Sequence, residues 1–265
     1  MQSQIPNPQS QILIDTHTHL YDDRLDNAAQ DAMIQRAIDA GLARLYMPNC
    51  DAGTIPGMMR IAQDWPEHCF PMMGLHPCYV KEDFEKELKE MEYWLQQQSF
   101  AAVGEIGLDF YWDKTFVSQQ QQAFERQIGL ALAHALPIVI HSRESTRECI
   151  DTVRRFQNGK LGGIFHCFSG TLDEAKEIAA LGFYIGIGGV VTYKKSTLPE
   201  VVAAMPLEAI VLETDAPYLS PVPYRGKPNE SGYLPLIAQK IAEVKNISVA
   251  EVAAATTANA RKIFG

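Results

Sequence analysis

Two histidines, His17 and His19, follow a short apolar run at residues 12–15. If that run is a strand, residues two apart point to the same side of it, so both imidazoles would face one space. Imidazole nitrogens beside a carboxylate suit Zn, Mn, Fe or Co rather than a thiolate-type site. The pair therefore predicts one part of a metal-binding centre.

Similar residues stand at the ends of later apolar runs, namely His76, Glu105, Asp109, His141, Arg143, His166 and Asp215. In a parallel barrel these ends meet at the carboxyl-terminal face, where active sites of this fold lie. Four histidines and two carboxylates are enough for two divalent ions that share a bridging carboxylate; they are His17, His19, Glu105, His141, His166 and Asp215. The alternative is that these side chains only fill the barrel mouth.

Two such ions would activate a water and stabilise both oxygens of a displacement at phosphorus or carbon. Asp215 is placed to hold a metal and to accept the proton of that water, or it is a plain ligand. His76 could donate to a phosphate oxygen or cap its own loop. Arg143 could bind phosphate as a bidentate donor, or it could pair with Glu105 or Asp109.

A segment rich in proline and glycine, residues 221–230, follows the last apolar run. It carries two cations and an amide, which indicates a binding loop over the barrel mouth. We expect Arg225 and Asn229 to contact phosphate. The alternative is an ordinary solvent-exposed loop.

Short apolar runs alternate with helical patterns along the chain. The runs lie at 12–15, 44–48, 70–74, 101–105, 137–141, 163–166, 183–187 and 209–214. Regular alternation implies a parallel sheet, and eight units predict an α/β fold of the TIM (β/α)8 barrel type in one domain spanning 12–265. A doubly wound open sheet is the alternative. Residues 1–11 are polar, with no basic start and no apolar stretch, so we expect a flexible tail rather than a signal peptide.

Composition narrows the function classes. The net charge of −9 argues against a protein that coats long duplex DNA, but it permits an enzyme that grips one or two phosphates with metal ions. Five cysteines without a CxxC pair favour a reduced, cytoplasmic protein. No apolar run is long enough to span a bilayer, so no membrane partner is expected, and no obligate protein partner is evident.

The motifs together resemble the TatD family of metal-dependent deoxyribonucleases, within the amidohydrolase-like superfamily. They are Asp15-Thr16-His17-Thr18-His19, Gly74-Leu75-His76-Pro77, Gly104-Glu105-Ile106-Gly107-Leu108-Asp109, His141-Ser142-Arg143, His166-Cys167-Phe168-Ser169-Gly170, Glu213-Thr214-Asp215-Ala216-Pro217 and the closing Thr257–Phe264 segment. The resemblance covers 12–264 with the motifs in family order. One departure is Ser231, where the family often has proline after Asn-Glu.

The resemblance implies a TIM barrel with a two-metal centre. One ion would be held by His17, His19, Glu105 and Asp215, and the second by Glu105, His141 and His166, with Glu105 bridging. Family members are described as Mg²⁺-dependent nucleases with 3′–5′ exonuclease action on single-stranded DNA. A ligand set this rich in histidine also suits Zn²⁺ or Mn²⁺.

We therefore expect a hydrolase acting on ester bonds, a deoxyribonuclease in which water activated by two metals attacks phosphorus. Glu105 and Asp215 would be its catalytic carboxylates, and DNA single strands or strand ends its substrate. An amidase or lactonase of the same superfamily is the second interpretation. A bridging carboxylated lysine would favour that branch, but the corresponding run ends in Glu105. The third is a non-catalytic binding protein that kept the barrel.

Overall fold

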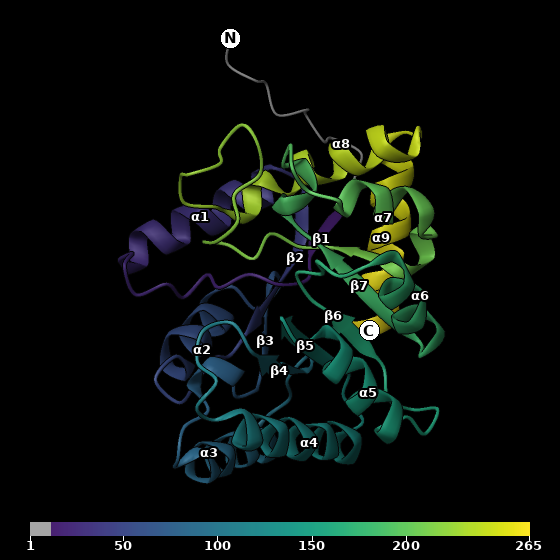
Figure 1. The fold of residues 1–265 in the computed structure, drawn as a ribbon. Coiled ribbons are helices and arrows are strands. Elements are labelled where there is room, and N and C mark those ends of the chain that lie inside the picture. Colours follow the sequence, from purple (N-terminus) through teal and green to yellow (C-terminus); the bar gives the residue numbers. More distant parts are fainter. Residues whose placement is uncertain (1–11) are drawn as a thin grey trace.

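The computed structural model describes residues 12–265, so the tail expected at 1–11 lies outside the described residues. Within them, eight strands alternate with helices along the chain (Figure 1). The strands are β1 (Leu13–Asp15), β2 (Leu42–Pro48), β3 (Cys69–Met72), β4 (Val103–Asp109), β5 (Ile138–Arg143), β6 (Gly163–Phe165), β7 (Phe183–Ile187) and β8 (Ile210–Leu212). Each overlaps an apolar run expected from the sequence.

The helices are α1 (Asn27–Asp39), α2 (Ile55–Asp64), α3 (Phe84–Gln97), α4 (Val117–His134), α5 (Thr146–Phe156), α6 (Leu172–Ala180), α7 (Leu198–Ala204), α8 (Leu234–Lys245) and α9 (Val249–Phe264). Local sequence signals fix several helix starts. In α9, the Ser248 hydroxyl accepts from the backbone N–H of Glu251, whose carboxylate accepts from the Ser248 N–H in return. This reciprocal cap satisfies two backbone donors that a helix start leaves unpaired.

All the strands pair in parallel, in the order β1-β2-β3 and β4-β5-β6-β7-β8. Two seams join these sheets into a ring. At the first, Met73 bridges to Val103 at the start of β4. At the second, the Thr16 N–H donates to the Leu212 carbonyl at 3.0 Å, which links β1 to β8. The closed barrel expected from the sequence is confirmed, and the open sheet is not observed in the described chain.

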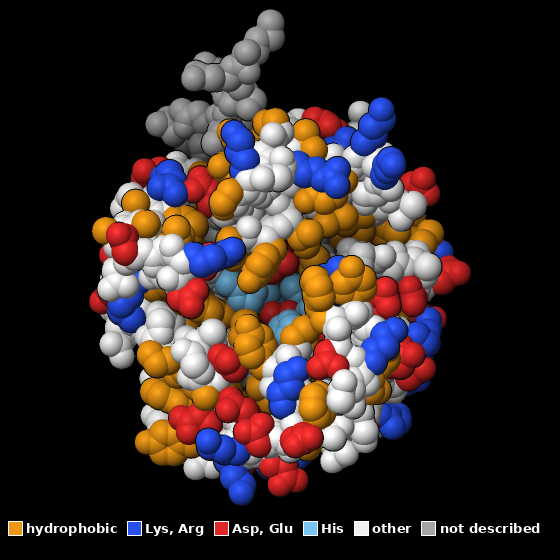
Figure 2. Space-filling view, turned by 60° about the vertical axis from the view of Figure 1, so that its left-hand side comes forward, with side chains coloured by type: hydrophobic (Ala, Val, Ile, Leu, Met, Phe, Trp, Pro, Cys, Tyr) orange, Lys and Arg blue, Asp and Glu red, His pale blue; other side chains and the backbone are white. Residues whose placement is uncertain are grey.

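One face of the molecule is hollowed, and histidine and acidic side chains lie at the floor of the hollow (Figure 2). The opposite, amino-terminal end of the barrel is closed by α9. There the Thr257 hydroxyl donates to the carbonyl of Ile12, just before β1, at 2.7 Å. The Asn259 amide donates to the carbonyls of Leu207 and Ile210 at the start of β8. The barrel is therefore open to solvent at the carboxyl-terminal end of its strands.

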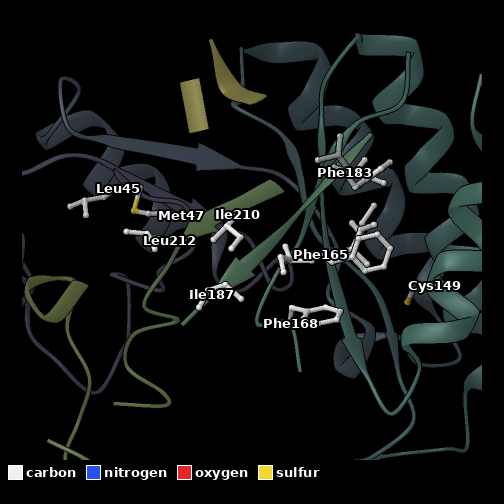
Figure 3. Packing of buried hydrophobic residues seen from close by; sticks show 14 of the residues in the cluster. Leu45, Met47, Cys149, Phe165, Phe168, Phe183, Ile187, Ile210 and Leu212 are labelled. Atoms are coloured by element: carbon white, nitrogen blue, oxygen red, sulfur yellow. The ribbon is translucent and has the colours of Figure 1, made fainter. Parts of the chain in front are cut away.

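Successive strand residues serve two different cores, as the two-residue period of a strand requires. On β2, Leu45 and Met47 belong to a large cluster shared with the helices, and Figure 3 shows part of it. Tyr46, between them, belongs to a smaller cluster inside the barrel. That inner layer contains Ile14, Tyr46, Met72, Ala102, Val139, Ile164, Val211 and, from α9, Ala260. The inner layer makes a solid floor beneath the hollow.

The inner layer predicts a specific cost of truncation. We expect Ile164→Ala to destabilise the protein by about 3 kcal/mol, because Ile164 is fully buried and its removal leaves a cavity in a rigid layer. The matched control Ile12→Ala, at a position 51% exposed, should change stability by less than about 0.5 kcal/mol. Urea unfolding measures both; equal midpoints for the two variants would contradict the assignment of this layer.

Candidate metal centre

Glu105 occupies the centre of the hollow and is only 1% exposed. Its Oε2 lies 3.2 Å from His17 Nε2 and 3.7 Å from His19 Nε2. Asp215 stands on the same side, with Oδ1 at 3.5 Å from His19 Nε2 and 3.8 Å from His17 Nε2. One Glu105 oxygen therefore faces a compact group of two imidazoles and a second carboxylate.

The other oxygen of Glu105 faces a different group. Oε1 lies 2.7 Å from His166 Nε2, 2.9 Å from His141 Nδ1 and 3.4 Å from His76 Nε2. His166 and His141 also approach each other, at 3.5 Å between Nε2 and Nδ1. The two oxygens of one carboxylate thus divide the ligand-type atoms into two sets, an arrangement suited to a bridging ligand.

Three groups of potential ligand atoms each lie within 4.8 Å of one another: His17, Glu105 and His166; His17, His19 and Asp215; and His76, Glu105 and His141. The six residues predicted as metal ligands are therefore brought together. His76 joins them, although its sequence suggested a phosphate contact or a loop cap. Its Nδ1 also accepts from the Cys78 N–H at 3.0 Å, so the capping role is observed as well.

His17 and His19 converge for a reason other than the one expected. β1 ends two residues before His17, so the pair lies in a loop and strand alternation does not orient it. Backbone hydrogen bonds fix this loop instead. The N–H of Thr18 donates to the Tyr46 carbonyl at 3.0 Å, and the N–H of His19 donates to the Ala216 carbonyl at 2.7 Å. The neighbouring strand ends therefore hold both imidazoles.

Close packing of β4 against β5 sets the depth of Glu105. Gly107 has φ +138°, and a Cβ there would lie 2.1 Å from the backbone oxygen of His141. At Gly104, a Cβ would lie 2.8 Å from the Cβ of Val139. Glycine at both positions lets the strand approach its neighbour closely around Glu105.

Buried nitrogen atoms in this cluster lack hydrogen-bond partners among the described residues, namely both ring nitrogens of His17 and Nδ1 of His166. Burial and the charge of His166 lower the pKa of His17 to about 4, so its imidazole is neutral near neutral pH. Buried polar atoms without partners cost free energy, and a divalent ion bound to a neutral imidazole removes that cost. The donor set therefore fits a metal ion.

Charge inside the cluster is balanced by the imidazoles. Burial disfavours the charged form of Glu105, but the nearby histidines, His166 foremost, outweigh it and hold the pKa of this carboxyl well below its usual range. Burial likewise opposes charge on His141, yet hydrogen bonds with Asp109 and Glu105 raise its pKa. An ionised Glu105 at neutral pH is what a bridging metal ligand must be.

Asp109 is a site residue that the sequence indicated only as a partner for Arg143. Its Oδ2 lies 2.9 Å from His141 Nε2, on the ring edge away from Glu105. A carboxylate there fixes the tautomer and orientation of a ligating imidazole. Asp109 lies four residues after Glu105 on the same strand. This even spacing places both side chains on one face of the strand, so the sequence could have indicated Asp109 as a site residue.

Glu213 is a second carboxyl group beside the ligand cluster. Its Oε1 lies 3.7 Å from His166 Nδ1, and burial raises its pKa to about 8. A Cβ on Gly186 would lie 2.1 Å from Glu213 Oε2. The glycines at 186–189 resemble a phosphate loop in sequence, but Gly186 makes room for this carboxyl group.

The two arginines expected to bind phosphate, Arg143 and Arg225, each lie over an aromatic ring. Arg143 is exposed and its guanidinium lies over the Tyr111 ring, not against Glu105 or Asp109. Arg225 lies over the Tyr193 ring, 4.5 Å from its centroid. Both cations remain accessible from solvent.

Asn229 serves its own loop, which differs from the phosphate contact expected of it. It is buried, and its amide donates to the carbonyls of Thr214 at 2.8 Å and Tyr218 at 2.6 Å. Both amide hydrogens are thereby used. The side chain holds the loop that carries Asp215 and has no donor left for a phosphate.

Comparisons with known proteins agree with this site. The sequence model described as TatD related DNase matches residues 14–265. The chain is 35% identical to an uncharacterized metal-dependent hydrolase, YabD, of Bacillus subtilis, covering 96% of this chain and 99% of that protein. It is 33% identical to a 3′-5′ ssDNA/RNA exonuclease, TatD, of Edwardsiella piscicida, covering 88% and 92%. The crystal structure of the TatD homologue YjjV of Escherichia coli superposes with a TM-score of 0.89 at 30% identity, covering 95% and 97%.

Two carboxylates should affect metal binding to different degrees. We expect Asp109→Asn to weaken divalent metal binding about tenfold, because it loses the charge that orients His141. Glu105→Gln should weaken it further, since both groups of ligands lose a shared anion. The control Asp113→Asn changes a half-buried carboxylate outside the ligand cluster, which pairs with Lys81. Metal content after dialysis against graded chelator measures this; equal retention in all three variants would contradict the centre described here.

Proposed function

This chain belongs to the TatD family of metal-dependent hydrolases, and on that basis we propose that it hydrolyses phosphodiester bonds at the end of a DNA single strand, acting as a 3′–5′ exonuclease. The observation that carries the proposal is Glu105, whose two oxygens face two separate groups of metal-ligand atoms. A pair of ions on one carboxylate is the recurring arrangement of enzymes that displace an oxygen at phosphorus.

Each oxygen of Glu105 defines one proposed ion site. His17, His19 and Asp215 would hold an ion with Oε2, while His141 and His166 would hold another with Oε1. When bound, the ions would supply Lewis acidity, lowering the pKa of a water and neutralising charge that develops on the phosphate. Mg²⁺, Mn²⁺ and Zn²⁺ are all compatible with imidazole and carboxylate ligands, and the histidine content favours the latter two.

Asp215 is the proposed proton acceptor. Its Oδ1 faces the imidazoles of His17 and His19, which leaves Oδ2 to accept the proton of the attacking water. The N–H of Asp215 donates to the His17 carbonyl at 2.9 Å, so the segment that carries this carboxylate is held against the end of the neighbouring strand β1. Asp109 keeps His141 oriented while the proton moves.

Two cations at the mouth are proposed to bind phosphate groups. Among residues 12–265, no carboxylate lies in salt-bridge contact with Arg143 or Arg225. Arg225 lines a pocket of about 300 Å³ with Val190, Tyr193, Lys195, Ser196 and Thr197. That lining has two cations, three hydroxyl groups and no acid, as an anion site requires.

The net charge of −9 is consistent with this proposal. Binding along a duplex depends on many cation–phosphate contacts, which an acidic surface opposes. At the mouth, divalent ions would dominate the local potential and reverse its sign. We therefore infer local binding of a strand end rather than wrapping of a duplex.

A substrate panel tests the proposal. Metal-free protein is supplied with Mg²⁺, Mn²⁺ or Zn²⁺ and offered a single-stranded oligonucleotide, a phosphotriester, an acyl-amino acid and a lactone. We expect cleavage of the oligonucleotide, reduced to background in His141→Ala because one ion loses a ligand and Glu105 loses a partner. Circular dichroism controls for folding of the variant. Activity confined to the acyl-amino acid or the lactone would instead identify a carbonyl hydrolase.

Arg225 makes a separate prediction. We expect Arg225→Ala to raise KM for an oligonucleotide about tenfold, since it removes a charge-assisted hydrogen bond to phosphate. Metal content should change little, because Arg225 contacts none of the ligand residues. Arg126→Ala is the matched control, since Arg126 pairs with Glu92 on the outer helices. An unchanged KM in Arg225→Ala would remove this residue from the substrate site.

A further inference from the structure

Two aromatic rings stand exposed on the loop that follows β4. Trp112 is 68% exposed and Tyr111 is 48% exposed. Trp65 and Trp94, by contrast, pack against the hydrophobic core. Tryptophan is highly buried on average in folded proteins, whereas this indole adds little buried area to the hydrophobic core.

The exposed rings are tied directly to the metal centre. The backbone N–H groups of Tyr111 and Trp112 each donate to Asp109 Oδ1 at 2.9 Å. The other oxygen of Asp109 contacts His141 at 2.9 Å. One carboxylate therefore fixes the backbone of this loop relative to a proposed metal ligand.

A cation completes the group. The Arg143 guanidinium carbon lies 4.0 Å from the Tyr111 ring centroid and 5.2 Å from that of Trp112, and the two rings meet edge to face at 4.9 Å. Its backbone carbonyl accepts from the Phe110 N–H at 3.0 Å, which joins it to the same loop. Aromatic rings thus hold Arg143 in place, and the described part of the chain offers its guanidinium N–H groups no acceptor.

Arg143 is one of three arginines in the described chain that lie over an aromatic ring; the others are Arg44 over Phe70 and Arg225 over Tyr193. Seven other arginines pair with carboxylates on the surface: Arg24, Arg36, Arg60, Arg126, Arg147, Arg154 and Arg155. Arg143 precedes Glu144 in the chain and lies opposite Asp109 on the neighbouring strand, but its side chain pairs with neither in the described chain. A guanidinium held without an acidic partner, beside an open aromatic face, matches the two parts of a nucleotide.

We propose that Trp112 is a stacking platform for a nucleobase of an unpaired strand, and that Arg143 binds the phosphate next to that base. The Arg143 guanidinium lies closer to the Tyr111 ring than to the Trp112 ring, and Trp112 is the more exposed of the two, so its indole is the ring proposed to take the base. Stacking on an aromatic ring accepts every base, since each has a flat π-face. Duplex bases are already stacked on one another, so the platform selects single strands. This inference rests on the proposed function and adds to it a subsite for one base of the strand.

The test compares two oligomers of equal length, oligodeoxythymidylate and an abasic oligomer with the same phosphates. We expect Trp112→Ala to raise KM for oligodeoxythymidylate about tenfold and to narrow the preference over the abasic oligomer. Trp112→Phe should restore most of that preference, because a phenyl ring also stacks. Tyr93→Ala is the control, since Tyr93 is 54% exposed on α3 and no cation of residues 12–265 lies over its ring.

The outcomes distinguish a failure of the proposed stacking on Trp112 from a failure of the proposed hydrolysis. If Trp112→Ala raises KM equally for both oligomers, or for neither, the platform is wrong. If the wild-type protein cleaves neither oligomer, the proposed hydrolysis fails, and a titration then decides the platform alone. Quenching of tryptophan fluorescence by oligodeoxythymidylate that disappears in Trp112→Ala supports it. Equal quenching in wild type and Trp112→Ala overturns it.

Discussion

The structure depends on one buried carboxylate, Glu105, surrounded by imidazoles on both of its oxygens. A buried charge without partners is strongly unfavourable. The Glu105 carboxylate can therefore be buried only together with the imidazoles that surround it. Two glycines, Gly104 and Gly107, give β4 the close approach that places Glu105 among the histidines. Remove that carboxylate, and the imidazoles on either side lose the anion that they share.

The barrel supplies what this carboxylate requires. An inner apolar layer and α9 close one end, so that polar side chains can gather only at the other. Two further acids contact the ligand imidazoles from behind: Asp109 lies against His141, and Glu213 lies 3.7 Å from His166. Asp109 also holds the loop of Trp112. Asp109 would therefore position both a metal ligand and the loop proposed to bind the DNA strand.

Much of this was predictable, because apolar runs locate the strands and a parallel barrel brings their ends together. The six expected ligands follow from that rule, and a family resemblance sorted them into two sets. The sequence could not predict the contacts that depend on the conformations of loops. The loop of His17 is oriented by other strand ends, and the Asn229 amide is used by the backbone around it. The position of Arg143 over Tyr111 likewise depends on how the end of β5 meets the loop that follows β4.

The central claim is that Glu105 joins two ion sites. Crystals of the protein soaked in Mn²⁺ and measured at the manganese absorption edge would test it most directly. The account predicts two anomalous peaks, one on each side of Glu105, with the first beside His19 and Asp215 and the second beside His141 and His166. A single peak, or peaks that do not contact Glu105, would contradict it.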